Sequence, residues 1–585
     1  MKNKSVKIIL LVILIIASFL RLWKITEVPV SLFGDELDVG YQAYSILKTG
    51  RDYNGNFLPL HFHSIAEWRT PLYLYTCVPT VAIFGITPLG VRLPAAIFGI
   101  LNVLLMYLLV SELLNYGSRS MDSKKRNSFL TKSQVIALVS SAFLAVSPWH
   151  LQYSRAAFEV TQLLFFYLSG IYFFIKTLSN PKYFWLCALS LGLTPWIYST
   201  AKFFTPMLLV FLFIVWFKDI LAIQRKELVN GIATFFILGI PLVYAIFFSG
   251  GGQRFSYISV FSDPAMEGTI GFARQIDAAA ESPNRSVLEK ISTRIIHNKY
   301  SYWGGIIINN YFTSFSTNFL FNMGDLNRRH NIEGMGELHK LDVIPLLSGL
   351  IMFFGFYKNK KVKILIAFWI LGGVLPSSLT RDGGNHATRL IVILPPIMFL
   401  LSYGLVEFIA LFKNRWKIVV LTCYLLTLSL SFYFYQHNYW VHNPWYSERW
   451  WHAGFEETIK YLKANENKYD KIIFSNANEP PQIFFAAWYP YPPNEWQKGF
   501  KTVKIDGFSD LENIGKYYIG QMDKIGIYDL NKYLPDNSLY VAVEREVKIN
   551  LIMEPGRVPP GLKLIKYVAY PSGEPAFYLF ERSEK

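Results

Sequence analysis

The sequence predicts a multi-span α-helical membrane protein that carries a small α/β domain at its C-terminal end. Hydrophobic residues make up 52% of the 585 positions and charged residues only 17%, whereas about a quarter of a soluble chain is charged. Apolar runs of the kind that form membrane helices recur through the first three quarters of the chain. The last part, about 150 residues, instead mixes polar, proline-rich and short apolar stretches.

The chain begins with a basic stretch, residues 1–7, followed by an apolar run over 8–20 and then Arg21. No small-residue cleavage site follows this run, so we expect a retained first span that enters from the cytoplasm. Further apolar runs cover residues 72–86, 93–110, 135–146, 163–175, 184–197, 203–217, 232–248, 343–356, 364–375, 390–411 and 418–434.

Basic clusters between these runs set the expected number of spans, because Lys and Arg concentrate in cytoplasmic loops. If the run 72–86 crossed the membrane, all five clusters would face outward; if it does not cross, all five face inward. Pro71, Pro79 and Pro88 also make this run a poor straight helix. We therefore expect about eleven spans, with 72–86 not crossing. The clusters lie at 119–132, 176–182, 218–226, 358–363 and 413–417.

This topology predicts a membrane module over residues 1–434, with a first outer loop at 25–91 and a long outer loop at 249–341. Residues 435–585 are then an extracytoplasmic α/β domain of a protein integral to the plasma membrane. In that domain Phe455, Ile459 and Leu462 have helical spacing, and 471–475, 538–543 and 576–580 have the composition of strands.

The pair Asp35-Glu36 follows the first span and begins a stretch in which Val39, Ala43 and Ile46 share one helical face. We expect an amphipathic helix on the bilayer surface. The two acids either cap this helix, where negative charge is favourable, or supply a general base. The pattern alone favours neither interpretation.

Four arginines lie in turns that are expected to face outward: Arg69, Arg155, Arg381 and Arg389. Such cations suit a phosphate group. Each of them alone is equally explained as a side chain that snorkels to the membrane interface, but several on one face together with carboxylates favour a site.

Metal and cofactor signals are weak. His61 and His63 form a His-x-His pair that could bind a metal, although exposed histidines are commoner, and His330 and His339 with nearby glutamates are weaker still. The long loop has no glycine-rich phosphate cradle. We therefore expect no cofactor and no resident metal, with a divalent cation as the lesser alternative. The three cysteines lie in apolar runs and indicate neither zinc nor disulfides.

The formal net charge of +16 is spread over short loops between apolar runs, which argues against nucleic-acid binding. The partners expected of the chain are membrane lipids and the substrates of its outward site.

Together these residues resemble the glycosyltransferases of the GT-C fold, in particular the protein O-mannosyltransferase-like enzymes and the lipid A aminoarabinose transferases. The resemblance covers roughly the first 220 residues and positions 376–400. The matching residues are Gly34-Asp35-Glu36 with Tyr41 and Ala43, Gly50, Gly55 and Pro59, Arg69-Thr70-Pro71-Leu72-Tyr73, the stretch 84–94, Ser147-Pro148 with Arg155 and Glu159, and His386-Ala387-Thr388-Arg389 before Leu394-Pro395-Pro396.

The resemblance implies an inverting sugar transfer from a polyprenyl-phosphate carrier to an acceptor hydroxyl, without a nucleotide-metal site. It implies that Asp35 is the base, supported by Glu36, and that Glu159 is a second acidic residue. Arg69 is implied to contact the lipid phosphate. The other candidate donor-binding residues are Tyr73, Arg155, Arg381, His386 and Arg389.

Two other functions remain open from the sequence. A transporter or flippase for lipid-linked sugars would favour charged residues within the spans and paired halves, but the spans are nearly free of charge and no halves are evident. A receptor that binds a ligand through the C-terminal domain would not need the arginine turns. The sequence does not indicate the sugar, or whether the acceptor is protein, lipid or glycan.

Overall fold

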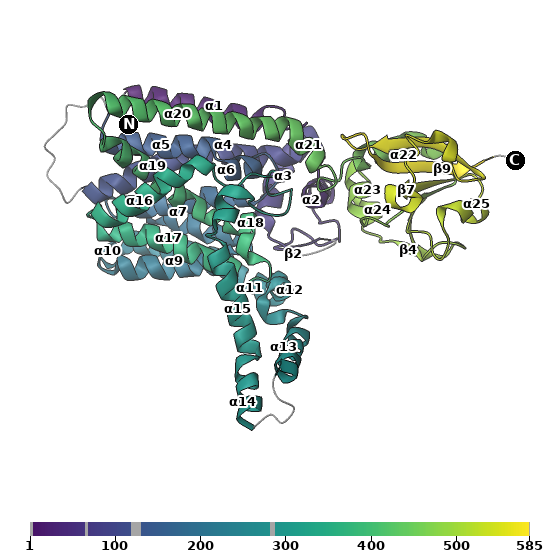
Figure 1. Cartoon of the computed structure of the whole chain (residues 1–585), viewed down its shortest axis with the longest axis horizontal. Helices are drawn as coiled ribbons and strands as arrows, with labels where there is room; N and C mark the ends of the chain where they lie inside the picture. Colours follow the sequence, from purple (N-terminus) through teal and green to yellow (C-terminus); the bar gives the residue numbers. More distant parts are fainter. Residues whose placement is uncertain (1–3, 65–67, 119–129, 281–286, 584–585) are drawn as a thin grey trace.

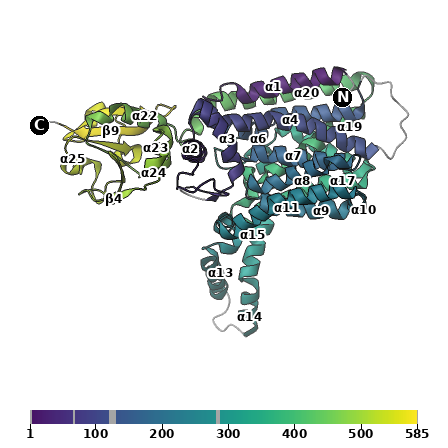
Figure 2. The same ribbon diagram turned by 180° about the vertical axis from the view of Figure 1, so that it is seen from behind.

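The structure is a computed structural model that describes residues 4–64, 68–118, 130–280 and 287–583. A bundle of long helices forms one part, and a domain with a β-sheet stands at one end of it (Figure 1). The C-terminus lies at the far end of this domain, away from the bundle (Figure 2). The predicted fold class, a helical membrane part with a C-terminal α/β domain, is confirmed.

The bundle helices coincide with the apolar runs of the sequence. Among the described residues, seven helices are long and apolar enough to cross a membrane, and α5 with α6 (Pro148–Ser154), bent by 58°, would make an eighth span. The chain is thus a multi-pass membrane protein, while the number of about eleven spans stays a prediction. The bundle contains α1 (Lys4–Leu22), α4 (Pro88–Ser118), α5 (Lys132–Val146), α7 (Val160–Thr177), α8 (Phe184–Leu193), α9 (Ala201–Val215), α11 (Arg225–Phe248), α16 (Val343–Phe356), α17 (Lys360–Ser378), α19 (Leu394–Ala410) and α20 (Asn414–His437).

Ion pairs between helix ends show that basic clusters gather at one end of the bundle. Lys132 Nζ lies 2.6 Å from Glu407 Oε1, Lys176 Nζ lies 3.8 Å from Glu112 Oε2, and Lys361 Nζ lies 2.5 Å from Asp219 Oδ2. Trp216 Nε1 donates to the Tyr116 hydroxyl at 3.0 Å, which joins the end of α9 to that of α4. Most of the cluster 119–132 lies outside the described residues.

The opposite end carries α2 (Gly34–Thr49) and α3 (Pro71–Phe84). Arg69, just before α3, and Arg92, in the first turn of α4, both form ion pairs within the first turn of α2. The segment 71–88 therefore begins and ends at the same end of the bundle. At 14 residues, α3 is about 21 Å long, less than the roughly 30 Å of a bilayer core.

The predicted helix is present as α2, but protein covers it on more than one side, and its position relative to the bilayer stays a prediction. Nine of its 16 residues are buried, including the polar side chains of Gln42 and Asp38. The reason is that α3 packs against one side of α2, and the C-terminal domain covers another through α23 (Gln482–Trp488). A Cβ on Gly40 would lie 2.9 Å from the Ile86 side chain, which shows how closely the segment after α3 approaches.

Helices occupy much of the long outer segment 249–341. Helices α13 (Met266–Ala280), α14 (Val287–Ile296) and α15 (Lys299–Thr313) form an arm that projects from the side of the bundle near the end that carries α2 (Figures 1 and 2). The shorter α12 (Gln253–Ile258) lies at the base of this arm and contacts β2 (Trp68–Arg69), which pairs with β1 (Phe62–His63).

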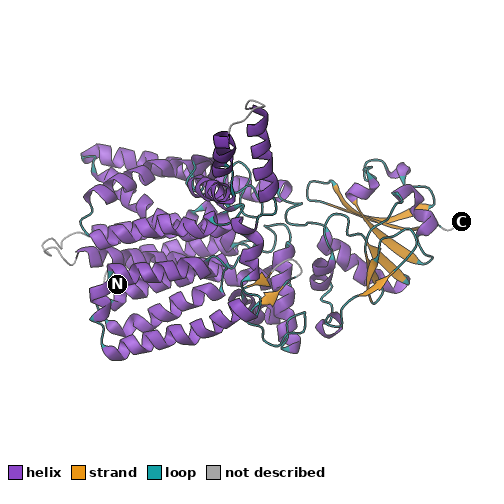
Figure 3. Cartoon of the chain, turned by 90° about the horizontal axis from the view of Figure 1, so that it is seen from below, coloured by secondary structure: helices purple, strands orange, loops and turns teal. Residues whose placement is uncertain are grey.

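The C-terminal domain is built on one mixed seven-stranded sheet (Figure 3). Three predicted strands and the predicted helix are confirmed, the helix as α22 (Phe455–Asn465). The central strand β3 runs parallel to both of its neighbours, and the remaining pairs are antiparallel. The strand order is β4 (Lys501–Val503), β5 (Leu511–Ile514), β6 (Tyr517–Ile519), β3 (Lys471–Phe474), β7 (Ser538–Val543), β9 (Pro575–Arg582) and β8 (Leu562–Ala569).

Both faces of this sheet are covered. Phe455, Ile459 and Phe485 of α22 and α23 belong to one apolar cluster, while Leu530 and Val547 belong to a second one. The first cluster continues into α2 and α3, so the domain and the bundle share a core. Polar contacts fix the same junction: the Tyr41 hydroxyl donates to the Tyr491 carbonyl at 3.0 Å, and Gln497 Nε2 donates to the Asp52 carbonyl at 2.9 Å.

Candidate functional site

Asp35 occupies the first turn of α2, at the junction of the bundle with the C-terminal domain. Its Oδ1 lies 2.7 Å from Arg69 Nη2, and Arg69 Nε lies 2.9 Å from Asp38 Oδ2. Arg69 and Asp38 are buried, whereas the side chain of Asp35 is 53% exposed. The Tyr53 hydroxyl donates to Asp38 Oδ1 at 2.8 Å. This arrangement holds Arg69 rigidly and presents one open carboxylate.

Glu36 points away from that opening. Its two oxygens accept from Nε and Nη2 of Arg92, each at 2.9 Å, and Oε1 also accepts from the Ala157 N–H at 2.8 Å. Both side chains of this pair are fully buried. Arg92 also donates to the carbonyls of Ile25 and Pro29. Glu36 therefore braces the loop that carries Asp35, and neither acid acts as the N-cap, which is Phe33.

A cavity of about 290 Å³ opens on the bundle side of Asp35. Three cations and two carboxylates line it, so its charge is net positive and suits an anionic group. Arg254 lies over the ring of Tyr198, with its Cζ 5.7 Å from the ring centroid. The lining residues are Phe33, Asp35, Arg69, Ala157, Phe158, Glu159, Tyr198, Arg254, Asn327, Arg329, His330, His386 and Thr388.

A second cavity, of about 200 Å³, shares Asp35, Arg69 and Arg329 with the first. Its far wall belongs to the C-terminal domain, including a pair in which His452 Nε2 lies 3.7 Å from Glu479 Oε1. Asp35, Arg69 and Arg329 line both cavities, so the two cavities adjoin at these side chains. The other lining residues of this second cavity are Gly34, Asp38, Ser64, His452, Glu479, Pro480, Ile483 and Phe484.

The pKa values of the two carboxylates in the larger cavity are shifted in opposite directions. Burial acts to raise the pKa of Asp35, but the attraction of Arg69, Arg329 and Arg254 outweighs it and holds this pKa below the ordinary 3.8. Burial raises the pKa of Glu159 above its ordinary 4.5, because Arg69 and Arg254 offset the burial only in part. Two acids whose pKa values are pushed apart suit different roles, and Asp35 is the one that remains ionised.

An apolar groove of about 230 Å³ lies beside the larger cavity, between α9, α11, α12 and α17. Lys202 at its margin donates to the Gly251 carbonyl at 2.7 Å and lies 3.1 Å from His61 Nε2. Arg254 belongs to the same short helix, α12, as Phe255 and Ile258 of the groove. A polar cavity next to an apolar groove suits an amphiphile with an anionic head.

The remaining predicted residues fall into two groups. Asp35, Glu159, Arg69 and His386 share the larger cavity, as the sequence predicted for a single site. Five others are not in its lining. Glu36 is one of them, and its pairing with Arg92 is described above. Arg155 donates to the Leu20 and Val28 carbonyls and to the Tyr439 hydroxyl, and Tyr73 donates to the Val91 carbonyl. Arg389 donates to Asp382 and Thr380, and Arg381 donates to the Tyr257 carbonyl.

The proposed His-x-His metal pair is not supported by geometry. His61 is buried next to the Lys202 ammonium, while His63 is exposed. Among the described residues, Asp325, His330 and His386 are instead close enough to share an ion, with one ligand atom from each lying within 4.8 Å of the others.

Sequence reasoning missed Arg254, Arg329, Tyr198 and Asp325. The first three of these line the larger cavity, and they come from segments far from Asp35 in the chain. The polar run Asp325-Leu-Asn-Arg-Arg-His330 was a usable signal, because so many polar groups within an outward loop need partners.

No family model matches the chain, and no curated protein matches it in sequence. In structure, it resembles ArnT from Cupriavidus metallidurans bound to undecaprenyl phosphate, with a TM-score of 0.50 at 9% identity, covering 98% of this chain and 97% of that one. This likeness confirms the expected GT-C fold.

Two other solved structures are similar more loosely. They are the oligosaccharyltransferase AglB from Archaeoglobus fulgidus, in complex with an inhibitory peptide and a dolichol-phosphate (TM-score 0.47, 12% identity, 83% of this chain), and the Saccharomyces cerevisiae protein O-mannosyltransferase Pmt1-Pmt2 complex bound to the sugar donor (TM-score 0.30, 18% identity, 44% of this chain and 34% of that one). The chain spans 63% of the length of the AglB structure.

Proposed function

We propose that this protein is a membrane glycosyltransferase that moves a sugar from a polyprenyl-phosphate carrier to an acceptor hydroxyl, with Asp35 as the general base. The observation that carries the proposal is the position of Asp35, an ionised and half-exposed carboxylate where two cavities adjoin. A general base has to lie within hydrogen-bond reach of the acceptor hydroxyl, and that hydroxyl in turn has to face the donor.

The larger cavity is the proposed donor site. A lipid phosphate carries negative charge, which Arg254 and Arg329 would stabilise, and this charge grows as the bond to the sugar breaks. The adjoining apolar groove provides room for the first isoprene units. The ArnT structure of similar fold holds undecaprenyl phosphate, which supports a carrier of this class.

The smaller cavity is the proposed acceptor site. An acceptor hydroxyl placed there gives its proton to Asp35 as its oxygen attacks the anomeric carbon. The bond from that carbon to the phosphate oxygen breaks at the same time, and the electron pair leaves with the lipid phosphate. A single displacement of this kind inverts the anomeric carbon. Arg69 stays paired with Asp38 throughout, which keeps the base in place.

We also propose that this end of the protein faces outward, with the C-terminal domain extracytoplasmic. The support is charge: the basic clusters paired by Lys132, Lys176 and Lys361 lie at the other end, which the positive-inside rule places in the cytoplasm. The site would then act on acceptors of the cell envelope.

The test supplies purified full-length protein in detergent with a panel of radiolabelled polyprenyl-phosphate monosaccharides, with and without an extract of envelope lipids and glycans. Wild-type protein is expected to release lipid phosphate from one of the donors and to transfer its label. Asp35→Asn should abolish both, while Asp536→Asn, an exposed acid far along the C-terminal domain, serves as the matched control. Equal release by wild type and Asp35→Asn refutes the role of Asp35, and no turnover of any donor refutes the activity.

A further inference from the structure

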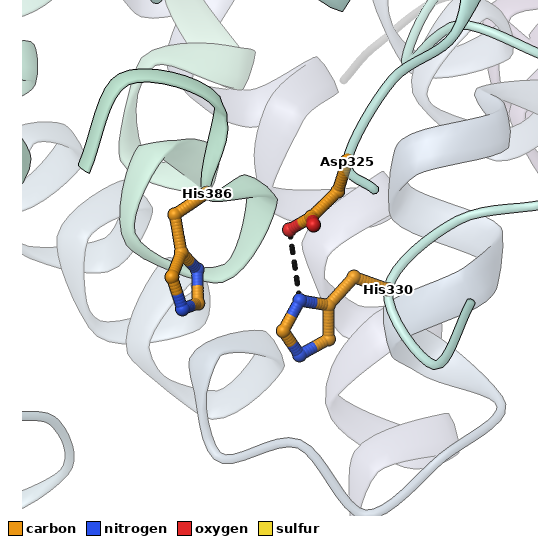
Figure 4. A group of neighbouring side chains, drawn as sticks. All are labelled: Asp325, His330 and His386. Carbon is orange, nitrogen blue, oxygen red and sulfur yellow. Dashed lines mark hydrogen bonds and ion pairs between the residues drawn. The ribbon is translucent and has the colours of Figure 1, made fainter. Parts of the chain in front are cut away.

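Asp325, His330 and His386 meet at the rear of the larger cavity, although they come from two separate outer loops. Asp325 Oδ2 accepts from His330 Nδ1 at 2.8 Å and from the Ala387 N–H at 2.9 Å. Figure 4 shows that His386 turns one ring nitrogen toward the Asp325 carboxylate and the His330 ring. The centroids of the two imidazole rings are 5.1 Å apart.

The backbone around this group is held by its own hydrogen bonds. Asn327 donates its N–H to Asp325 Oδ1 at 2.9 Å, and Glu337 Oε1 accepts the Asp325 N–H at 3.0 Å. Trp149 Nε1 donates to the Ala387 carbonyl at 3.2 Å, next to His386. The three side chains are therefore positioned before any ligand arrives, as in a pre-organised site.

Two buried polar atoms in and next to this group have no hydrogen-bond partner among the described residues. Within the described part of the chain, His386 Nδ1 has no hydrogen-bond partner, and neither has Glu337 Oε2. An unpaired buried acceptor costs about 1–3 kcal/mol, so such atoms call for a ligand. A cation would supply the missing partner for the imidazole.

We propose that Asp325, His330 and His386 bind a divalent cation of the zinc class. Two imidazoles and one carboxylate are ligands that Zn²⁺ prefers, whereas Mg²⁺ and Ca²⁺ prefer oxygen alone. Tetrahedral ligand atoms at zinc distances lie about 3.3 Å apart, and the three ligand atoms here all lie within 4.8 Å of one another, so no pair has to close by more than about 1.5 Å. Small side-chain rotations achieve this.

The ion would have an open side. His330 and His386 line the larger cavity, while Asp325 is buried behind them. Three protein ligands and a free position toward a cavity are typical of zinc sites that engage a substrate or water. Binding of the ion would displace the proton between Asp325 and His330 to solvent. The binding itself does not depend on the proposed sugar transfer.

The test is a binding measurement without donor or acceptor. Full-length protein is stripped with a chelator and titrated with ZnCl₂ in competition with a chromophoric chelator. We expect one ion per chain, and at least about 100-fold weaker binding in His386→Ala and in Asp325→Asn. His297→Ala is the matched control, because His297 also pairs with an aspartate, Asp277, at 3.0 Å but is not in a three-ligand group of the described residues.

A competing histidine pair has to be excluded. His437 is exposed and His442 is partly exposed, and their Nε2 atoms lie 3.2 Å apart. If His437→Ala abolishes the binding while His386→Ala retains it, the proposal is wrong, and the same holds if wild type binds no zinc. Should the variants fail to fold, X-ray absorption of zinc-loaded wild type decides: two imidazoles with oxygen ligands support the site, and one imidazole or a pure oxygen shell refutes it.

Discussion

Asp35→Asn removes the proposed proton acceptor and leaves its size almost unchanged. Loss of a general base slows a reaction by about 10²–10⁴-fold, which corresponds to about 3–5 kcal/mol of barrier. The cost in stability is expected to stay under about 1 kcal/mol, because the side chain of Asp35 is 53% exposed and Arg69 keeps its pair with Asp38. The variant should therefore be folded and inactive.

A substitution of the neighbouring Glu36 is expected to lower stability, and it therefore shows what a loss of folding looks like in comparison with Asp35→Asn. Glu36 and Arg92 are fully buried, and Glu36→Gln leaves the arginine charge without a counterion. Breaking such a pair costs about 3–5 kcal/mol of the free energy of unfolding. Thermal melting in detergent should thus separate the two variants, with a marked fall for Glu36→Gln only. Full kcat in a correctly folded Asp35→Asn would refute the assignment of the base.

The pH dependence tests the electrostatics of the same residue. A base acts when it is ionised, and the pKa of Asp35 lies below 3.8, so its ionisation should not limit the rate between about pH 5 and 8. Arg69→Gln removes the strongest attraction while burial, which raises the pKa, remains. The acidic limb of kcat/KM should then move to higher pH. A limb that moves to lower pH, or does not move, would contradict this account.

Three further predictions address the surroundings of Asp35. Arg254→Ala should raise KM for the lipid-phosphate donor about tenfold or more, with a smaller effect on acceptor KM; equal effects on both would count against a donor cavity. His452→Ala should raise acceptor KM and leave donor hydrolysis in the absence of acceptor unchanged; slowed hydrolysis would argue against separate cavities. In intact cells an impermeant maleimide should label Lys504→Cys in the C-terminal domain but not Lys360→Cys at the basic end, and the reverse pattern would invert the topology.

The sequence predicted those helices and strands whose formation depends on the composition and spacing of neighbouring residues. Strands β3, β7 and β9 follow from strand-like composition, helix α22 follows from helical spacing, and the bundle follows from apolar runs. The α2 helix was predicted, but the protein contacts that cover it were not. Its burial depends on α23, more than 430 residues later, and no periodicity within α2 reports that contact.

The site was predicted in part for the same reason. Asp35 and Glu36 are adjacent, and consecutive helical residues point about 100° apart, so one faces the cavity and the other faces Arg92. The sequence could not say which acid does which. Likewise Arg155 was predicted as a donor-binding residue, but its partners in the structure, the Leu20 and Val28 carbonyls, lie more than 120 residues away in the chain. Only the fold shows that it braces the first outer loop.

The partners of the arginines determine which kind of ligand the larger cavity can bind. Arg92 forms an ion pair with Glu36 and donates to the Pro29 carbonyl, and Arg155 donates to the Val28 carbonyl. Arg69 forms ion pairs with both Asp35 and Asp38. Arg254 and Arg329 line the cavity as well, together with Asp35 and with Glu159, whose raised pKa makes it easier to neutralise. Such a balance accommodates one phosphate without stripping Asp35 of the ionised state that a base requires. A cation held by Asp325, His330 and His386 would add positive charge to the same cavity, and it would favour donors with more negative charge.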